Sequence, residues 1–169
     1  MRTFAALLCV WSALLLSGCV AGVNVILSDA DQEQAITRYK QQLAKEPDSW
    51  LLHRRIGLAY FDLKKYAQAE QSLQEVQARS PGEAVSLLYL GLSRIGKGER
   101  EAGLDLLTTF RWPGKFYQQK FVQEEAMRLR KHPEAPAKEV IADILSALEA
   151  GRREQDELER DMSWGGMSR

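Results

Sequence analysis

The sequence predicts an all-α fold built from stacked helical hairpins, and three observations support this prediction. Apolar residues recur at helical spacing along most of the chain, in segments that end at prolines. In two segments an alanine is followed by a proline twelve residues later, and the second segment lies 34 residues after the first. A pair made of an aliphatic residue and glycine also recurs after 34 residues. This interval indicates a helical unit repeated with a period of about 34 residues. The residues that carry the period are Ala35 with Pro47, Ala69 with Pro81, and Ile56-Gly57 with Leu90-Gly91.

Residues 50 to 81 show the repeated unit most clearly, as two helices joined by a short turn. Gly57 and Ala69 are small, so the two helices can cross closely at these positions. Larger side chains are expected to fill the space around this crossing, and they are Ile56, Tyr60 and Leu73.

This pattern resembles the tetratricopeptide repeat, a helical hairpin of about 34 residues that stacks into a curved solenoid. Ile56-Gly57 stand at the Leu-Gly positions of the repeat. The resemblance implies a concave groove, lined by the first helix of each hairpin, that binds a protein or peptide and has no chemistry of its own. The other matching positions are Tyr60, Ala69, Leu73 and Pro81.

The resemblance covers residues 29–112, as about two and a half repeats. Residues 29–47 are expected to form the second helix of a repeat whose first helix is missing. His53 stands where the repeat has its aromatic residue, and Trp50 lies one helical turn away on the same face, so the indole is expected to cover that end of the hairpin. The full repeat is expected to have its helices at about residues 50–63 and 66–79.

The third unit departs from the pattern in two ways. Residues 80–83 read Ser-Pro-Gly-Glu, a capping box with Pro81 at the first helical position, so a helix is expected to begin there. Ala102 falls one position short of a full period after Ala69. This spacing predicts that one residue is lost from the turn at residues 96–98.

Residues 113–150 are expected to form C-terminal capping helices. About three repeats are needed for a stable solenoid, so two and a half leave an apolar face that needs a cover. Apolar residues recur at helical spacing over residues 115–131, and Pro136 is expected to open the last helix. Residues 151–169 are highly charged and are expected to form a helical extension or a flexible tail.

Residues 1–18 have the layout of a bacterial lipoprotein signal peptide. One positive charge precedes an apolar run that is shorter than the roughly 20 residues of a membrane-spanning helix. The run ends in Leu-Ser-Gly-Cys, which resembles the lipobox, so Cys19 would carry the acyl chains, palmitate among them, and residues 19–28 would form the tether. The alternatives are an ordinary secretory signal with a chance cysteine, or an uncleaved anchor.

The resemblance implies a lipid-anchored protein of the bacterial cell envelope that faces the periplasm. Val20 after the cysteine resembles the arrangement that directs lipoproteins to the outer membrane. Cys9 lies inside the signal, so no pair of free thiols is expected in the mature chain. The 23 basic and 23 acidic residues cancel, which gives no reason to expect a nucleic-acid partner.

No catalytic, metal or cofactor site is expected, and the protein is not expected to be an enzyme or to take a small-molecule substrate. His53 and His132 are the only histidines, and no metal-binding spacing of His and Cys occurs near either. His53 is expected to be a partly buried helix residue and His132 to lie at a helix C-terminus, where a cation is favoured.

The groove is therefore the candidate functional surface, and the resemblance assigns its residues. Two arginines beside apolar side chains would suit an extended or helical peptide with acidic and hydrophobic anchors. The alternative is that the apolar members are core and the arginines only solvated. The positions are Leu51, Arg54, Arg55, Leu58, Phe61, Asp62, Val85, Leu88, Tyr89 and Leu92.

Two functions follow from this reading. The first is a membrane-anchored scaffold or adaptor that binds a protein or peptide partner in an envelope-associated complex. The second is a structural accessory subunit of a secretion, pilus or outer-membrane assembly apparatus, with no open peptide groove.

Overall fold

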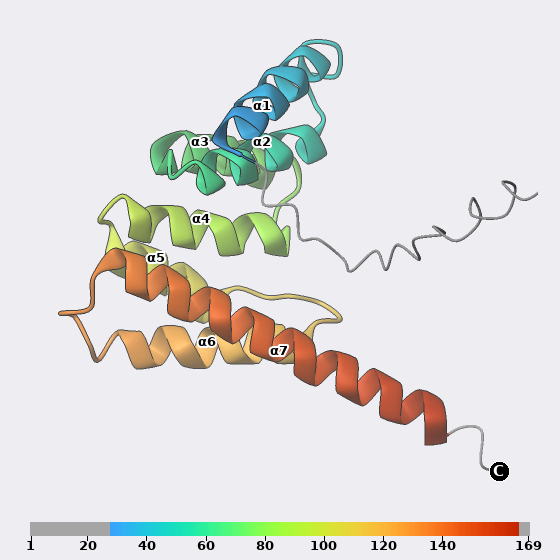
Figure 1. Ribbon diagram of the computed structural model, residues 1–169, viewed down its shortest axis with the longest axis vertical. Helices are drawn as coiled ribbons and strands as arrows, with labels where there is room; N and C mark the ends of the chain where they lie inside the picture. The colour runs from blue at the N-terminus through green and yellow to red at the C-terminus, as the bar shows by residue number, and fades with distance from the viewer. Residues whose placement is uncertain (1–27, 166–169) are drawn as a thin grey trace, which may run out of the picture.

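The computed structural model describes the backbone of residues 28–165 and the side chains through residue 161, and this part of the chain is all helical (Figure 1). The all-α prediction is confirmed, because no strand occurs among these residues. Cys19 and the signal segment lie outside the described residues. The seven helices of residues 28–165 are α1 (Asp29–Leu43), α2 (Trp50–Asp62), α3 (Tyr66–Arg79), α4 (Ala84–Gly96), α5 (Arg100–Thr109), α6 (Phe116–Leu129) and α7 (Ala137–Gly165).

α1 begins at a capping box. The Ser28 hydroxyl accepts a hydrogen bond from the backbone N–H of Asp31 at 3.2 Å, and the Asp31 carboxylate accepts one from the backbone N–H of Ser28 at 3.1 Å. One face of α1 then packs on α2, where Ile36 meets Ile56 in a small apolar cluster. α1 therefore stands where the sequence predicts the second helix of a repeat whose first helix is missing.

The hairpin of α2 and α3 closes around Gly57. A Cβ atom at this position would lie only 2.7 Å from Leu73 Cγ, so glycine is required for the helices to approach this closely. The turn between the helices uses a left-handed residue, Lys64, with φ of 57°. One period later Gly98 has φ of 92°, so the two hairpins turn in the same way.

The hairpin of α4 and α5 keeps the period of the first hairpin, and the expected loss of one residue is wrong. Gly91 faces Leu107 across this hairpin, as Gly57 faces Leu73 in the first, and both members of the pair have moved by one full period. The small residue at the crossing is the buried Gly103, while Ala102 is exposed. Glycine meets the need for a small residue at this crossing as well as alanine does, so the spacing of alanines alone predicts the wrong position.

The predicted start of the third unit is also corrected, since α4 begins at Ala84 and Pro81 lies outside the helix. Glu83 is the N-cap, and its carboxylate accepts a hydrogen bond from the backbone N–H of Ser86 at 2.6 Å. Gly82 has φ of 81°, so the chain turns there before the helix starts. Proline and glycine thus form the turn between two repeats.

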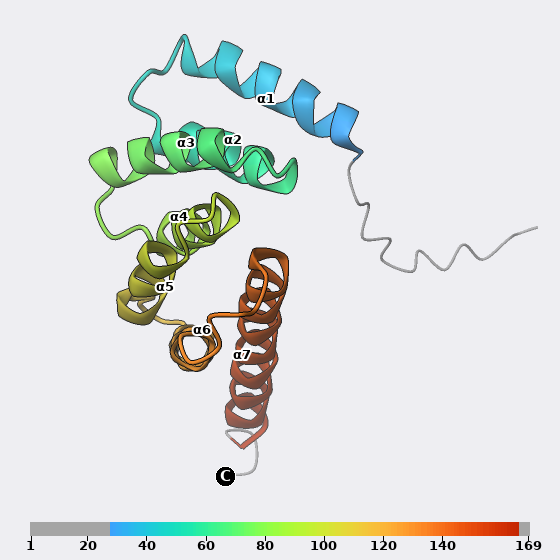
Figure 2. The same ribbon diagram turned by 90° about the vertical axis from the view of Figure 1, so that its left-hand side faces the viewer.

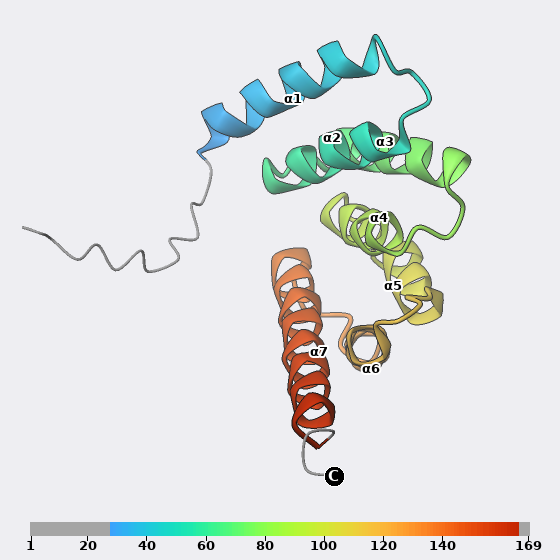
Figure 3. The same cartoon turned by 90° about the vertical axis from the view of Figure 1, so that its right-hand side faces the viewer.

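α6 and α7 form an antiparallel pair at the C-terminal end of the stack. They approach closely at Gly151, where a Cβ atom would lie 2.5 Å from the carbonyl oxygen of Tyr117. Figure 2 and Figure 3 show α7 against α6 and α4, on the side away from α5. α7 continues through residue 151 without a break, so the charged segment is helical as far as Gly165.

Arg100 joins this pair to the repeats. It stands one period after Tyr66, whose ring packs edge-on against Phe61 with 5.6 Å between the ring centres, but Arg100 makes hydrogen bonds instead. Its guanidinium donates to the carbonyl oxygens of Leu129 at 2.8 Å, His132 at 2.8 Å and Ala135 at 2.7 Å. These carbonyls follow the end of α6, where a cation is favoured.

Candidate partner-binding surface

The groove positions assigned from the sequence share one face of the stack. In α2, Leu51, Arg55 and Leu58 lie on the same side of the helix, because residues three and four apart are neighbours on a helix surface. Their counterparts one period later, in α4, are Val85, Tyr89 and Leu92. The structure therefore brings the assigned residues together on adjacent helices.

The α4 part of this face is covered by the C-terminal pair. Leu88 and Leu92 are completely buried, in the same apolar cluster as Val140 and Ile144 of α7. Phe61 is also a core residue, only 8% exposed. In this structure these three residues therefore belong to the core, which is the alternative that the sequence leaves open, and α7 covers the two that lie on α4.

The α2 part of the face is less covered. Leu51 and Leu58 are half-buried, and Arg55 and Asp62 are exposed. The Arg55 guanidinium lies 5.7 Å from the centre of the Tyr39 ring, which holds it beside α1. On α2, apolar and charged side chains therefore lie next to one another and are at least partly accessible.

Arg54 has a structural partner. It donates a hydrogen bond to the Glu83 carboxylate at 2.8 Å, and both side chains are largely covered, with 26% and 13% of their surface exposed. The guanidinium also lies 5.2 Å from the centre of the Trp50 ring, which is itself 36% exposed. Arg54 therefore ties α2 to the N-terminus of α4, and Trp50 packs on Arg54 instead of serving as a buried cover of the hairpin.

Tyr89 lies between the covered and the uncovered parts. Its ring packs edge-on against Phe61, with 5.0 Å between the ring centres. Burial, together with the negative charges of Asp62 and Glu149, raises the pKa of Tyr89, so the phenol stays a neutral hydrogen-bond donor. Tyr89, which belongs to α4, therefore interacts with residues of both α2 and α7.

Asp62 gives this region a carboxylate. Asp62 is exposed as a residue, but partial burial of its carboxyl group raises the pKa of Asp62, and the hydrogen bond from Gln32 at 3.2 Å opposes that shift. Asp62 thus adds a carboxylate and Arg55 a guanidinium to the same helix face, while Glu149 on α7 is paired with Arg152 at 2.9 Å. A partner of mixed charge would match this arrangement.

Sequence reasoning missed two members of the site. Glu83 was assigned to a capping box, and its role as the partner of Arg54 depends on the packing of α2 against α4. Glu149 stands in a charged segment with no motif, and only the path of α7 brings it near Tyr89. Neither residue carries a signal in the sequence that separates it from its charged neighbours.

The described residues show no group of three His, Cys, Asp or Glu side chains placed to hold a metal ion. His53 is partly buried in α2, and His132 follows the end of α6, with its ring nitrogen 3.2 Å from the Glu134 carboxylate. Among helices in the described part of the chain, none has the length and apolar character needed to cross a membrane.

The fold and this surface define an all-α protein with a repeated helical hairpin. In comparisons with known proteins, no family model, no curated protein and no solved structure matches the chain.

Proposed function

We propose that this protein is a lipid-anchored scaffold of the tetratricopeptide type, which binds a protein or peptide partner in an envelope-associated complex. The observation that carries the proposal is the uncovered face of α2, where half-buried Leu51 and Leu58 stand beside exposed Arg55 and Asp62. Apolar side chains flanked by charges of both signs suit the recognition of a polypeptide.

The anchor would act by confinement. Acylation of Cys19 would hold the repeats near a bilayer and so raise the local concentration of a bound partner. Metabolic labelling with tritiated palmitate tests this part of the proposal. We expect label on the wild-type chain and none on Cys19→Ala; an unlabelled wild-type chain excludes the anchor.

The second candidate function is a structural accessory subunit without an open groove. The complete burial of Leu88 and Leu92 favours it, because α7 has taken the place that a peptide would occupy on α4. In that case the protein would meet its neighbours through other surfaces.

Photo-crosslinking in the native membrane separates the two functions. A photoreactive residue replaces Arg55 or Leu58 on the uncovered face, and Ala102, exposed on α5, serves as the matched control. We expect a discrete crosslinked product from positions 55 and 58 and none from position 102. A product from position 102 alone would favour the accessory function, and the absence of a product at positions 55 and 58 contradicts binding through α2.

A further inference from the structure

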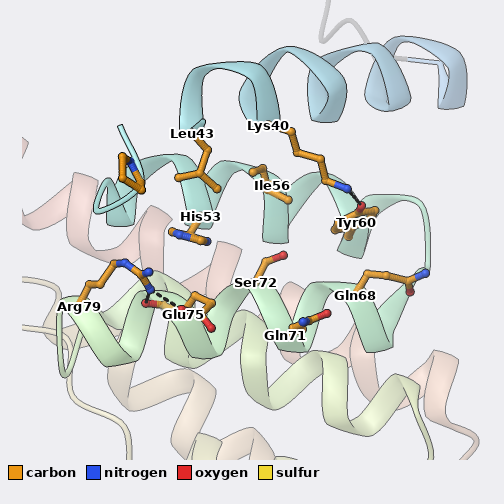
Figure 4. Close-up of a pocket in the computed structure, with 11 residues that line it drawn as sticks. Lys40, Leu43, His53, Ile56, Tyr60, Gln68, Gln71, Ser72, Glu75 and Arg79 are labelled. Carbon is orange, nitrogen blue, oxygen red and sulfur yellow. Dashed lines mark hydrogen bonds and ion pairs between the residues drawn. The ribbon is translucent and has the colours of Figure 1, made fainter. Parts of the chain in front are cut away.

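A groove of about 560 Å³ lies between α1, α2 and α3 (Figure 4). Its α2 wall includes His53, Ile56 and Tyr60. At about 100° per residue these side chains point away from Leu51 and Leu58, so the groove lies on the opposite face of α2 from the surface described above. Its volume is in the range of ligand-binding sites.

The α3 wall of the groove is a ladder of polar side chains. Gln68 lies one helical turn before the adjacent pair Gln71 and Ser72, and in the structure of residues 28–165 none of these side chains has a hydrogen-bond partner within the chain. A side-chain amide both donates and accepts, so it can pair with the N–H and C=O groups of a peptide backbone whatever its sequence. From Gln68 to Arg79 the wall is about 16 Å long, which matches about five residues of extended chain.

The floor of the groove is apolar and contains one unsatisfied polar atom. Leu43 and Ile56 face into it (Figure 4), and Pro47 also lines the groove. The Nε2 atom of His53 is buried and has no hydrogen-bond partner among the described residues. A buried polar atom without a partner is unfavourable, so a ligand group that bonded to the imidazole would be stabilised there.

The charges of the groove favour an acidic ligand. Lys40 donates a hydrogen bond to the Tyr60 hydroxyl at 2.7 Å, and no carboxylate of the described residues pairs with it. Arg79 is paired with Glu75 on its own helix. The groove therefore has one uncompensated positive charge, at the Lys40 end.

The next step of the stack shows that this opening is not a general property of the repeat. The positions one period after Lys40 and Leu43 are Gln74 and Gln77. Gln77 fills the equivalent place: its amide donates to the carbonyl oxygen of Glu83 at 3.1 Å and accepts from the N–H of Gly82 at 2.9 Å. The counterpart of Tyr60 is Arg94, which is bound to Glu70 at 3.0 Å. The cation at the second position is therefore paired with a carboxylate, whereas Lys40 bonds only to the neutral Tyr60 hydroxyl.

We propose that the groove between α1, α2 and α3 binds an extended peptide segment of another protein, with apolar side chains on the floor and an acidic side chain at Lys40. The α3 amides pair with the peptide backbone, and the specificity comes from the floor and from Lys40. This site is independent of the uncovered face of α2, so either one can fail without the other.

Selection of short random peptides displayed on phage tests the proposal on the full chain in detergent. Bound peptides are then measured against Lys40→Glu, which reverses the free charge, and Ser72→Trp, which fills the groove. The matched controls are Lys45→Glu and Ala78→Trp, both at positions outside the groove. Circular dichroism and thermal melting establish that each variant is folded.

We expect selected peptides to be enriched in one acidic residue among apolar ones. Their affinity should fall about tenfold with Lys40→Glu and be lost with Ser72→Trp, and it should stay within about twofold of wild type in the two controls. Peptides that bind the Ser72→Trp variant as well as wild type, or that lose affinity with Tyr89→Ala instead, would overturn the proposal. A selection that enriches no peptide overturns it too, and a lack of acidic residues overturns the assignment of Lys40.

Discussion

Glu70 is a buried carboxylate held by two cations of the next repeat. It is 8% exposed and accepts hydrogen bonds from Arg94 at 3.0 Å and from Lys97 at 2.5 Å. Burial alone would raise the pKa of Glu70, but the bonds from Lys97 and Arg94 hold it below its ordinary value of 4.5. The ionised form therefore contributes to stability at neutral pH and links α3 to α4.

The stability that Glu70 contributes should disappear in acid. A carboxylate with a lowered pKa in the folded state stabilises the fold above its ordinary pKa, and the contribution is lost as the pH falls through the folded pKa. We expect Glu70→Gln to lower the free energy of unfolding by about 2 kcal/mol at pH 7. The difference from wild type should shrink below pH 4.5.

Urea denaturation across this pH range measures the effect, with Glu101→Gln as the control because Glu101 is exposed on α5. An equal loss at pH 7 and in acid would show that Glu70 acts through packing alone.

Gly103 and Ala102 offer a direct test of the repeat register. A Cβ atom on Gly103 would lie 2.5 Å from the carbonyl oxygen of Gly91, whereas Ala102 is exposed. We expect Gly103→Ala to destabilise the protein by about 1–3 kcal/mol, although alanine favours helix formation. Ala102→Leu should change the stability by less than about 0.5 kcal/mol.

Chemical denaturation of both variants gives the two values. If Ala102→Leu lowered the stability more than Gly103→Ala does, Ala102 would be the residue at the helix crossing, as expected when one residue is lost from the turn.

The residue scale also shows where sequence reasoning ends. Small residues at a helix crossing were predicted correctly at Gly57 and Ala69, because the repeat pattern specifies them. Glu70 could not be distinguished in the sequence, since its partners lie 24 and 27 residues away and glutamate is common on exposed helix faces. Burial of a charge depends on tertiary packing, which local patterns do not record.

α7 contains a glycine in the middle of a long helix, and the packing of α6 explains it. Glycine is less favourable than alanine in a helix interior by about 1 kcal/mol. At Gly151, however, a Cβ atom would lie 2.5 Å from the oxygen of Tyr117 and 2.7 Å from the backbone nitrogen of Gln118. These are backbone atoms, so the two helices would have to move apart.

We expect Gly151→Ala to lower the free energy of unfolding by about 1–3 kcal/mol, because the separation of α6 and α7 outweighs the gain in helix propensity. Ser146→Ala, at an exposed position of the same helix, should be neutral or slightly stabilising. Guanidinium denaturation distinguishes the two. If Gly151→Ala stabilises the protein, the close approach of α6 and α7 is not as described.

At the scale of helices, the sequence predicted well where the repeat pattern applied. The bounds expected for α3 are those observed, and α2 ends within one residue of its expected end. α4 was expected to begin too early, because proline at a first helical position and proline in a turn give the same signal. The sequence does not determine where α7 ends, because its C-terminal part is exposed and charge pairs such as Arg152 with Asp156 stabilise it instead of a core.

The fold as a whole depends on the contact of α7 with α4, and the repeat period does not predict this contact. The repeat period places α2, α4 and their partners next to one another, so the stacking could be deduced from spacing. The C-terminal pair lies outside the repeat, and the sequence showed only that some cover was needed. That α7 covers α4 and leaves α2 less covered was decided by the path of the chain after α5, and this determines which candidate site residues remain accessible.

Truncation tests how far the repeats rely on this cover. Without α6 and α7, the four fully buried leucines of α4 and α5 would lose part of their cover, and these are Leu88, Leu92, Leu104 and Leu107. Burial of one leucine contributes about 2 kcal/mol, so the loss is comparable to the roughly 5–15 kcal/mol that stabilises a typical domain. We expect a chain that ends at residue 112 to lose cooperative thermal unfolding and to bind a hydrophobic dye. A chain that ends at residue 151 keeps the helix pair, so it should retain most of the transition.

Circular dichroism melting of the two truncated chains beside the full chain measures this difference. A chain ending at residue 112 that still melted cooperatively near the full-length midpoint would show that the repeats are stable alone. α7 would then be a removable cover over Leu88 and Leu92, and the groove assigned from the sequence would open when it leaves. Loss of folding instead makes α7 part of the core, which restricts any partner on this side of the molecule to α2 and the region around Tyr89.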